Sequence, residues 1–508
     1  MSNDSPLSFV DLFAGCGGLS LGLMQSGWNG CLAIERNDQA FYTYYHNLVK
    51  ENCTASHYGG LNGAHTWLES DWASNLICYP KFETAPTVGE RYRREANVGC
   101  INQILENHGE DLKKLSGQID LVAGGPPCQG FSSFGKRNPR DERNSLFKSY
   151  YEFIRLVQPK LILFENVVGI TRAFSSKGKE AAFAEQIEQH FEGYTTYSQV
   201  IRASECGVPQ IRPRFIMIGA RNDLMPSRKY SKAGLCHLLE FSEEFGLPVS
   251  GLINKARESV LRSVLGSDRG DEVFKGKPIT LKEAITDLET CVYDPGLYPT
   301  RSDLSGFEER FRKCDDPDSL RNYWEIEPKE LKKPPTNAYL QYVRRNLPGT
   351  VRPNSLRLAS QSREIRERYR LILDWYKKEN TLRKGAELPK EYRLKLEKFV
   401  HENAADPEPG ILKKQILIPL DPDGPSRAVT SNPDDHIHYS EPRTLTPREN
   451  ARIQSFPDWF EFKGKFTTGG DTRKVDVPRN TQVGNAVPPL LARVLGESLK
   501  DLLMKLGA

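Results

Sequence analysis

The sequence of 508 residues lacks the features of membrane, secreted and zinc-binding proteins. It has no apolar run of membrane-spanning length, and Met1–Leu7 lacks the basic and apolar regions of a signal peptide. Its ten cysteines form no CxxC pair and no short Cys/His cluster, which argues against a zinc site and a disulfide framework. We therefore expect a cytoplasmic protein with reduced cysteines, no metal and no membrane partner.

The composition does include enough apolar residues for sizeable cores, and its charge is unevenly distributed. The hydrophobic content is 38%, and the length predicts two or three domains. Residues 341–400 contain 16 Lys and Arg against 7 Asp and Glu, a local excess of +9, whereas the whole chain carries only +4. Such a basic segment fits a surface that faces a polyanion. A solvated helical face with i,i+4 ion pairs explains it equally well.

A short loop around Cys128 is the most informative stretch. Ile119–Ala123 is predicted to be a buried strand, and Gly124–Ser132 follows with two glycines and two prolines. Because ligands bind at the carboxyl edge of open α/β sheets, a thiol in this loop would be presented to a ligand. Taken alone, Cys128 could equally be a small packing residue in a turn.

The start of the chain has the pattern of a nucleotide-binding unit. Leu7–Phe13 is predicted to be a strand, Ala14–Gly18 a glycine turn, and the residues after it a helix. Gly30–Ile34 is the next predicted strand, and Glu35 at its end suits hydrogen bonds to ribose hydroxyls. This pattern is shared by many nucleotide and dinucleotide folds.

Further along, acidic and basic residues adjoin two more predicted strands. Glu165 follows the strand Lys160–Phe164 and is expected at the same sheet edge as Cys128. Structural capping of a turn is the alternative role for Glu165. Before the strand Phe215–Gly219, Gln210, Arg212 and Arg214 alternate toward one face, where arginine suits a carbonyl or phosphate. An outward-facing surface strand is the alternative there.

Helix signals mark the second half of the chain. Arg363–Lys378 is a predicted helix with Ile365, Tyr369, Ile372 and Tyr376 on one face. Thr446, Pro447 and Glu449 occupy the N-cap, first and capping-box positions of another helix. The last predicted helix is Leu490–Leu503.

Six blocks, taken in this order along the chain, resemble the cytosine-C5 DNA methyltransferase family. They are Asp11–Gly18, Pro126–Gln129, Phe164–Val167, Gln210–Arg214, Arg443–Asp458 and Gln482–Pro489. The resemblance covers both ends of the chain and thins between about residues 222 and 415. It implies an α/β fold, with a Rossmann-like S-adenosylmethionine-dependent methyltransferase sheet and an inserted smaller target-recognition domain.

The resemblance also implies a domain organisation. Residues 1–290 would form the catalytic and cofactor-binding domain, with an insertion at about 51–95. Residues 291–440 would form the target-recognition region. Residues 441–508 would supply a helix that supports the recognition lobe and then return to the catalytic domain, where the last helix packs beside the first.

Site residues follow from the matching blocks. The implied catalytic residues are the nucleophile Cys128, the acid Glu165 at cytosine N3, and the base contact Arg214 supported by Arg212. The residues implied to bind S-adenosylmethionine are Phe13, Ala14, Gly15, Gly17, Gly18, Leu19, Glu35, Pro127, Leu146 and Asn485. Where the family has an aspartate near the adenine, this sequence has Gly99-Cys100-Ile101, and Asp71 is another candidate, so no residue is assigned.

The expected function is methylation of cytosine C5 in a specific double-stranded DNA sequence, with the target base flipped out of the helix. A cognate restriction endonuclease acting separately and a monomeric state are also expected. The alternatives are a tRNA cytosine-C5 methyltransferase and a catalytically silent DNA-binding relative. The base-reading residues within 222–440 and the recognition sequence cannot be extracted from one sequence.

Overall fold

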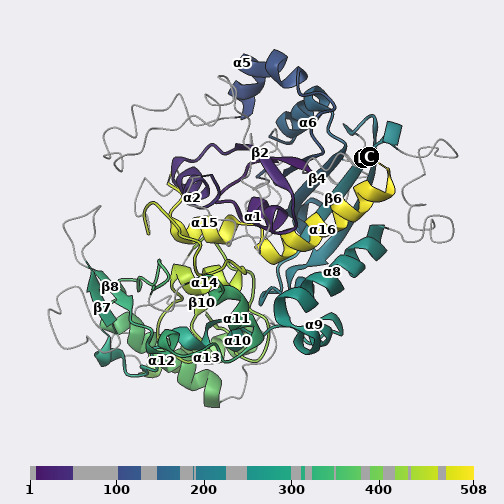
Figure 1. Cartoon of the computed structure of the whole chain (residues 1–508). Coiled ribbons are helices and arrows are strands. Elements are labelled where there is room, and N and C mark those ends of the chain that lie inside the picture. Colours follow the sequence, from purple (N-terminus) through teal and green to yellow (C-terminus); the bar gives the residue numbers. More distant parts are fainter. Residues whose placement is uncertain are drawn as a thin grey trace. The chain divides into compact units, whose positions relative to one another are not determined.

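A computed structural model describes most of the chain (Figure 1). The described residues are 7–49, 101–127, 146–171, 187, 190–224, 249–298, 311–314, 323–347, 351–378, 390–403, 418–432, 436–466 and 476–507. They form two compact units. Unit 1 comprises Met1–Cys206, Pro213–Val260 and Val487–Ala508, and unit 2 comprises Gly207–Arg212 and Leu261–Ala486. The predicted insertion at about 51–95 and Cys128 lie outside the described residues.

Unit 1 is built on a six-stranded sheet with the order β2-β1-β3-β4-β6-β5. Its strands are β1 Ser8–Leu12, β2 Asn29–Ile34, β3 Leu121–Gly124, β4 Leu161–Val167, β5 Tyr194–Arg202 and β6 Pro213–Arg221. The first four strands are mutually parallel, and β6 runs antiparallel to both β4 and β5. The parallel strands are almost entirely buried, as expected for a sheet covered on its faces. The predicted α/β class is thereby confirmed.

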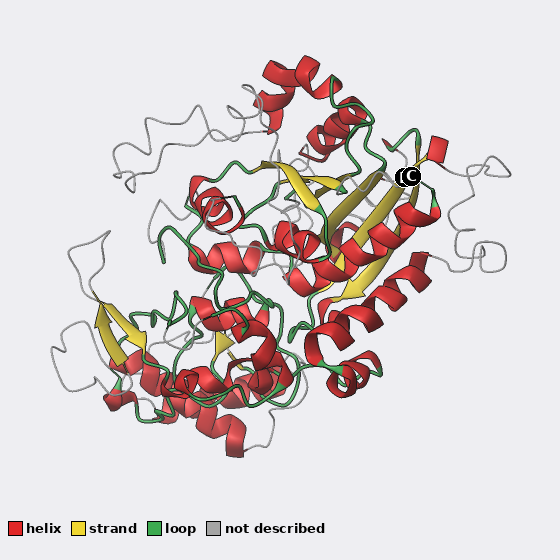
Figure 2. Ribbon diagram, in the orientation of Figure 1, coloured by secondary structure: helices red, strands yellow, loops and turns green. Residues whose placement is uncertain are grey.

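Helices flank this sheet, as Figure 2 shows. They are α1 Gly18–Gln25, α2 Asp38–Leu48, α5 Ile101–Lys113, α6 Leu146–Val157 and α16 Pro489–Lys505, and α8 Val249–Leu265 spans the passage into unit 2. The amphipathic pattern of Leu146–Val157 by itself predicts a helix with the bounds of α6. Its apolar face, including Phe147, Tyr150 and Phe153, packs in the core with strand residues such as Val122 and Phe164.

The last helix packs beside the first, as the family resemblance implies. Trp28, just after α1, donates its Nε1–H to the carbonyl of Gly496 in α16 at 2.9 Å. A Cβ on Gly22 of α1 would lie 2.3 Å from the Pro489 oxygen, so only glycine allows this approach. A contact between residues 468 positions apart therefore holds the two ends of the chain together in unit 1.

Unit 2 contains mostly helices. They are α9 Ser267–Phe274, α10 Leu281–Ile285, α11 Ala338–Arg344, α12 Arg363–Lys378, α13 Lys390–Asn403, α14 Pro447–Ile453 and α15 Arg479–Asn485. Two small sheets join β7 Phe311–Cys314 to β8 Tyr323–Ile326 and β9 Ile418–Pro419 to β10 His436–Ile437. The β7–β8 pair lies within Pro295–Pro335, a stretch whose sequence predicts a loop-rich segment.

Two helices of unit 2 confirm their sequence signals. The predicted bounds and apolar face of α12 are correct, because Tyr369, Ile372 and Tyr376 are buried in one cluster. At α14, Thr446 and Glu449 form the predicted capping box. The domain boundaries at residues 290 and 440 stay predictions. The compact units change after residues 206, 212, 260 and 486.

Candidate active site

The carboxyl ends of the four parallel strands of unit 1 lie in register. Leu12 of β1 is beside Ile34 of β2 and Gly124 of β3, and Gly124 is beside Phe164 of β4. The residues that directly follow these positions are Phe13, Glu35, Gly125 and Glu165. The register therefore places three predicted site residues at one sheet edge, where open α/β sheets bind their ligands.

Glu165 and Arg214 form an ion pair at this edge. Arg214 Nε lies 2.8 Å from Glu165 Oε1, and the two side chains are only 12% and 11% exposed. The antiparallel register sets Glu165 opposite Ile216, so Arg214 is its diagonal neighbour on the same face. Burial lowers the pKa of Arg214, and the negative charge of Glu165 opposes this shift.

The position of Glu165 corrects one prediction. The sequence places it directly after its strand, but β4 continues to Val167 because Glu165, Asn166 and Val167 pair with β6. A Cβ built on Gly125 would lie 2.8 Å from Glu165 Oε2, so the absence of a side chain there leaves room for the carboxylate. The carboxylate is thus held by Arg214 of β6, and Gly125, the residue after β3, leaves space for it.

Asn166 ties the loop before Cys128 to the same edge. Its Nδ2 donates to the carbonyl of Pro126 at 2.9 Å. Asn166 lies in the matching block Phe164–Val167 but is not among the site residues that the resemblance implies, although an amide directly beside a predicted acid is a usable signal. Pro127 is described and exposed, and Cys128, the next residue, lies outside the described residues.

Glu35 organises the glycine turn that follows β1. Its Oε2 accepts from the Gly15 N–H at 2.9 Å, and its Oε1 accepts from the Asn37 N–H at 2.7 Å. Burial raises the pKa of Glu35, and these two backbone donors oppose the rise. A carboxylate has about four acceptor sites, so capacity remains for ribose hydroxyls.

The turn itself has the backbone of a ligand cradle. Phe13 has φ of +62°, which is costly for an aromatic residue and is typical of binding sites. Gly15 and Gly17 also have positive φ, and a Cβ on Gly15 would meet no atom within 4 Å. Ala14 and Gly18 at the two ends of this turn, and Leu19 after it, are buried. The open space over Gly15 and the acceptors of Glu35 fit a nucleoside ligand.

The remaining predicted residues lie at different places. Leu146 begins α6 and packs on the core of unit 1. Asn485 is the exposed last residue of α15 in unit 2. Arg212 is buried in unit 2, where it donates to the carbonyls of Val429 at 3.1 Å and Gly484 at 2.7 Å. Arg214 therefore meets Glu165, whereas Arg212 holds backbone groups.

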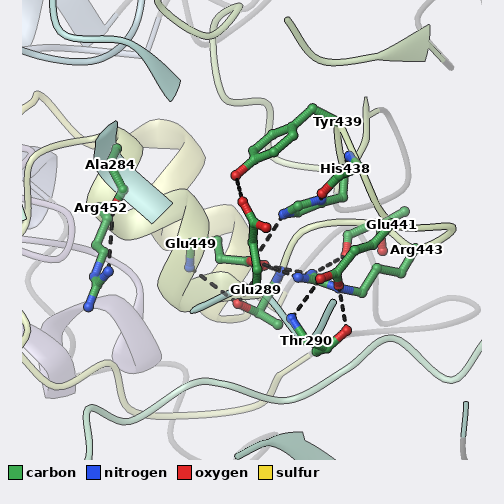
Figure 3. A network of polar contacts seen from close by, with 12 residues as sticks. Ala284, Glu289, Thr290, His438, Tyr439, Glu441, Arg443, Glu449 and Arg452 are labelled. Atoms are coloured by element: carbon green, nitrogen blue, oxygen red, sulfur yellow. Dashed lines mark hydrogen bonds and ion pairs between the residues drawn. The ribbon is translucent and has the colours of Figure 1, made fainter. Parts of the chain in front are cut away.

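The block from Arg443 to Asp458 forms a buried charge network in unit 2 (Figure 3). Arg443 donates to Glu441 at 2.6 Å and to both oxygens of Glu449 at 2.8 Å. Glu441 also accepts from Thr290 N at 2.6 Å and Thr290 Oγ1 at 2.7 Å. These groups satisfy one another, which is typical of a scaffold.

No helix in the described part of the chain is both long and apolar enough to cross a membrane. The same residues contain no group of three His, Cys, Asp or Glu side chains that could hold a metal ion. Among them, Cys16, Cys31 and Cys206 are buried cysteines. Burial raises the pKa of each of these thiols, as expected for inert packing residues.

Comparison with known proteins identifies the family. Residues 7–57, 60–286 and 309–501 match C-5 cytosine-specific DNA methylase. The chain belongs to this family. Its activity is therefore the transfer of a methyl group from S-adenosylmethionine to C5 of cytosine in DNA.

Similar proteins include named type II methyltransferases. M.DdeI of Desulfomicrobium norvegicum is 27% identical over 97% of this chain and 88% of its own length. M.XorII of Xanthomonas oryzae pv. oryzae is 26% identical, with 98% and 85% covered. A protein described as a DNA modification methyltransferase of an E. coli prophage has a similar fold, with a TM-score of 0.50 at 20% identity, over 98% and 99% of the two chains.

Proposed function

We propose that this C-5 cytosine DNA methylase uses Cys128 as nucleophile and Glu165 as acid on a flipped-out cytosine in a specific duplex sequence. The observation that carries the proposal is the Glu165–Arg214 pair, 2.8 Å apart, beside the Gly125–Pro127 loop that leads to Cys128. The pair thus offers a carboxyl group and a cation beside the loop that leads to the predicted nucleophile.

The cysteine is needed because C5 of cytosine is a poor nucleophile. Addition of the Cys128 thiolate to C6 forms a C–S bond and turns C5 into an enamine carbon. After methyl transfer, loss of the C5 proton and expulsion of the thiolate restore the aromatic ring. A free thiol is only a few per cent ionised at neutral pH, so a nearby cation favours the reactive form.

Glu165 and Arg214 act on the polar edge of the ring. Glu165 delivers a proton to N3 as the thiolate adds, which prevents negative charge from building up on the ring. Arg214 keeps Glu165 oriented and uses its remaining guanidinium donors for the cytosine carbonyl or a neighbouring phosphate. Asn166 fixes the loop through Pro126.

S-adenosylmethionine supplies an electrophilic methyl group when it is bound. Glu35 would hold the ribose hydroxyls, Phe13 would pack on the adenine, and Gly15 would allow close approach to the turn. Pro127, Leu146 and Asn485 would line the rest of this site. The C5 carbon must then face the methyl group, so the target base has to leave the helical stack, at a cost of a few kcal/mol.

Protection of host DNA from a separately acting restriction endonuclease is the biological role we propose. Its support is the similarity over almost the full chain to named type II methyltransferases. We also propose that the protein acts as a monomer.

Expression in a methylation-free host followed by bisulfite sequencing tests the activity. We expect 5-methylcytosine at one fixed position of one short sequence. Competition between unmodified duplex DNA and tRNA then separates the tRNA alternative. Soluble protein that leaves no modified position would contradict the proposal.

A trapping experiment tests the nucleophile. An oligonucleotide with 5-fluorocytosine at the mapped position should form a covalent adduct when S-adenosylmethionine is present, because fluorine cannot leave as a proton does. Cys128→Ala should abolish the adduct, whereas Cys291→Ala, at an exposed cysteine, should retain it. Methylation by the Cys128→Ala variant would refute the mechanism.

A further inference from the structure

A buried row of side-chain amides in unit 2 connects three segments that are far apart in the sequence. Gln210 and Gln454 are both 0% exposed. Gln210 Nε2 donates to Gln454 Oε1 at 2.8 Å, and Gln454 Nε2 donates to the Val483 carbonyl at 2.7 Å. The row, here called the amide relay, thus joins the segment before β6, the end of α14 and the last turn of α15.

Backbone groups at both ends fix the direction of the amide relay. Gln210 Oε1 accepts from the Val429 N–H at 2.8 Å, and a backbone N–H can only donate. The Nε2 of Gln210 must therefore face Gln454, whose own Nε2 must face Val483, because a carbonyl can only accept. One orientation of the two amides satisfies both ends, and the opposite orientation of either would set like groups against each other.

Arg212 strengthens the same end of the relay. It is 4% exposed, and its Nη2 donates to the Gly484 carbonyl at 2.7 Å. Its Nη1 donates to the Val429 carbonyl at 3.1 Å and lies 3.4 Å from Gln210 Oε1. Val483 and Gly484 are in the last turn of α15, where carbonyls lack intrahelical donors. Two side chains, those of Arg212 and Gln454, therefore bind carbonyls in the last turn of this helix.

The relay adjoins two places where the chain leaves unit 2. The chain passes into unit 1 after Arg212, two residues before Arg214, and again after Ala486, one residue beyond Asn485. Gln454 binds near both of these places. It contacts Gln210 near the first and the Val483 carbonyl near the second. A shift of this one amide would change the backbone on which both predicted ligand contacts stand.

We propose that Gln454 is a positioning residue that sets Asn485 toward S-adenosylmethionine and the start of β6, with Arg214, toward the target base. This inference rests on the proposed function, because Asn485 and Arg214 are its cofactor and base contacts. A relay that only stabilised unit 2 would affect folding and leave ligand affinity and rate unchanged.

Gln454→Met tests the relay, because methionine has a similar length and lacks both polar groups. We expect weaker binding of S-adenosylmethionine and slower single-turnover methylation, each by about 10- to 100-fold, as for small misplacements of reacting groups. The matched control is Gln482→Met. Gln482 is 2% exposed in the same helix, and its amide donates to the carbonyls of Lys463 and Val477 at 3.0 Å. The Gln482→Met variant should lower the melting temperature by a similar amount, with an unchanged KM for S-adenosylmethionine and an unchanged single-turnover rate.

Gln454→Glu allows a second test, the pH dependence of S-adenosylmethionine affinity, which a purely structural role would leave unchanged. The introduced carboxyl keeps an acceptor for Gln210, but when ionised it sets an oxygen against the Val483 carbonyl. When protonated, it regains a donor, and burial favours the protonated form. The loss in affinity for S-adenosylmethionine relative to wild type should therefore shrink as the pH falls, whereas the Gln454→Met loss should stay constant.

The outcomes separate the two levels of the proposal. Wild-type KM and single-turnover rate in both Gln454 variants would overturn the relay, and so would equal losses in the Gln482→Met control. Wild-type protein that methylates no DNA would refute the proposed function instead. Equilibrium binding of S-adenosylmethionine to the variants would still test the relay in that case.

Discussion

Arginine and glutamate meet in both compact units, but the number of partners differs. In unit 1, Glu165 has Arg214 as its ion-pair partner within the described part of the chain, and both side chains keep some exposure. In unit 2, Arg443 binds Glu441 and Glu449, and all three side chains are at most 1% exposed (Figure 3). The first pair keeps capacity for a ligand, and the second network has used its capacity internally.

This difference separates function from support within one chain. A charge that stabilises a fold is best surrounded by partners, because an unsatisfied buried charge is costly. A charge that binds a substrate needs donors or acceptors that the fold leaves unused. Sequence motifs alone do not separate the two cases, since both arginines lie in blocks typical of the family.

Glu165→Gln should give the largest functional effect. Glutamine keeps the shape and an acceptor for Arg214 but cannot deliver a proton to N3. We expect the single-turnover methylation rate per folded molecule to fall by about 10²- to 10⁴-fold. The matched control is Glu325→Gln, since Glu325 is also 11% exposed and lies 3.1 Å from Arg352. An equal loss of methylation rate in both variants would show that Glu165 has no specific role in the reaction.

Arg443→Met should give the largest loss of stability. It leaves Glu441 and Glu449 buried without their cation, so the free energy of unfolding should fall by about 3–5 kcal/mol in urea titrations. Arg262→Met, which breaks an ion pair with Asp271 at a 49% exposed arginine, should cost about 0–1 kcal/mol. The methylation rate per folded molecule of Arg443→Met should stay near that of wild type. An unchanged unfolding midpoint for Arg443→Met would contradict the scaffold role.

The pH dependence of stability should have opposite signs in the two units. In unit 1, burial raises the pKa of Asp11 from 3.8 to about 7, although Ser20 donates to it at 2.6 Å. The folded state therefore holds a proton that the unfolded state has lost, and stability falls as the pH rises from about 4 to 7. The full difference is about 4 kcal/mol. The free energy of unfolding of Asp11→Asn should rise relative to that of wild type over this range, as measured by denaturation at several pH values. A difference that stays constant with pH would exclude Asp11 as the source of the pH dependence.

In unit 2, burial lowers the pKa of His438 from 6.5 to about 4, and the nearby Arg443 contributes. Glu441 and Glu449 oppose the shift but do not reverse it. The unfolded state then binds a proton that the folded state does not, so stability is present above pH 6.5 and is lost toward pH 4. The loss amounts to about 3 kcal/mol. His438→Gln should flatten this acid limb, and a limb unchanged in the variant would exclude His438 as its source.

Local signals in the sequence predict much of this structure. The bounds of α6 and α12 follow from apolar periodicity, and the α14 capping box follows from Thr446 and Glu449. These features depend on residues within one or two turns of each other. The glycine turn before Glu35 is similarly local, which explains why the family blocks locate the cofactor edge.

Features set by distant pairing were not predictable in the same way. The extension of β4 through Glu165 depends on pairing with β6, about 50 residues later. The contact of Gln210 with Gln454 spans 244 residues and leaves no local pattern. The net charge of the basic segment 341–400 also overstates the positive charge that it presents to solvent. Arg366 is buried over Tyr298, and Arg344 pairs with Asp287. Part of its positive charge is thus neutralised or buried within unit 2.

Arg370→Met should give the smallest effect. Arg370 on α12 pairs with Glu367 and with Asp374, at 2.8 Å, and is 32% exposed, so its loss should change the free energy of unfolding by less than about 1 kcal/mol. A phosphate contact would release counterions, and losing it would lower the salt slope of DNA binding by about 0.9. Because two carboxylates already neutralise Arg370, we expect the slope of log Kd against log salt to stay unchanged. A slope reduced by about one would instead place this face of α12 on the DNA. Arg370 would then be a residue that binds the substrate, not one that only stabilises the fold.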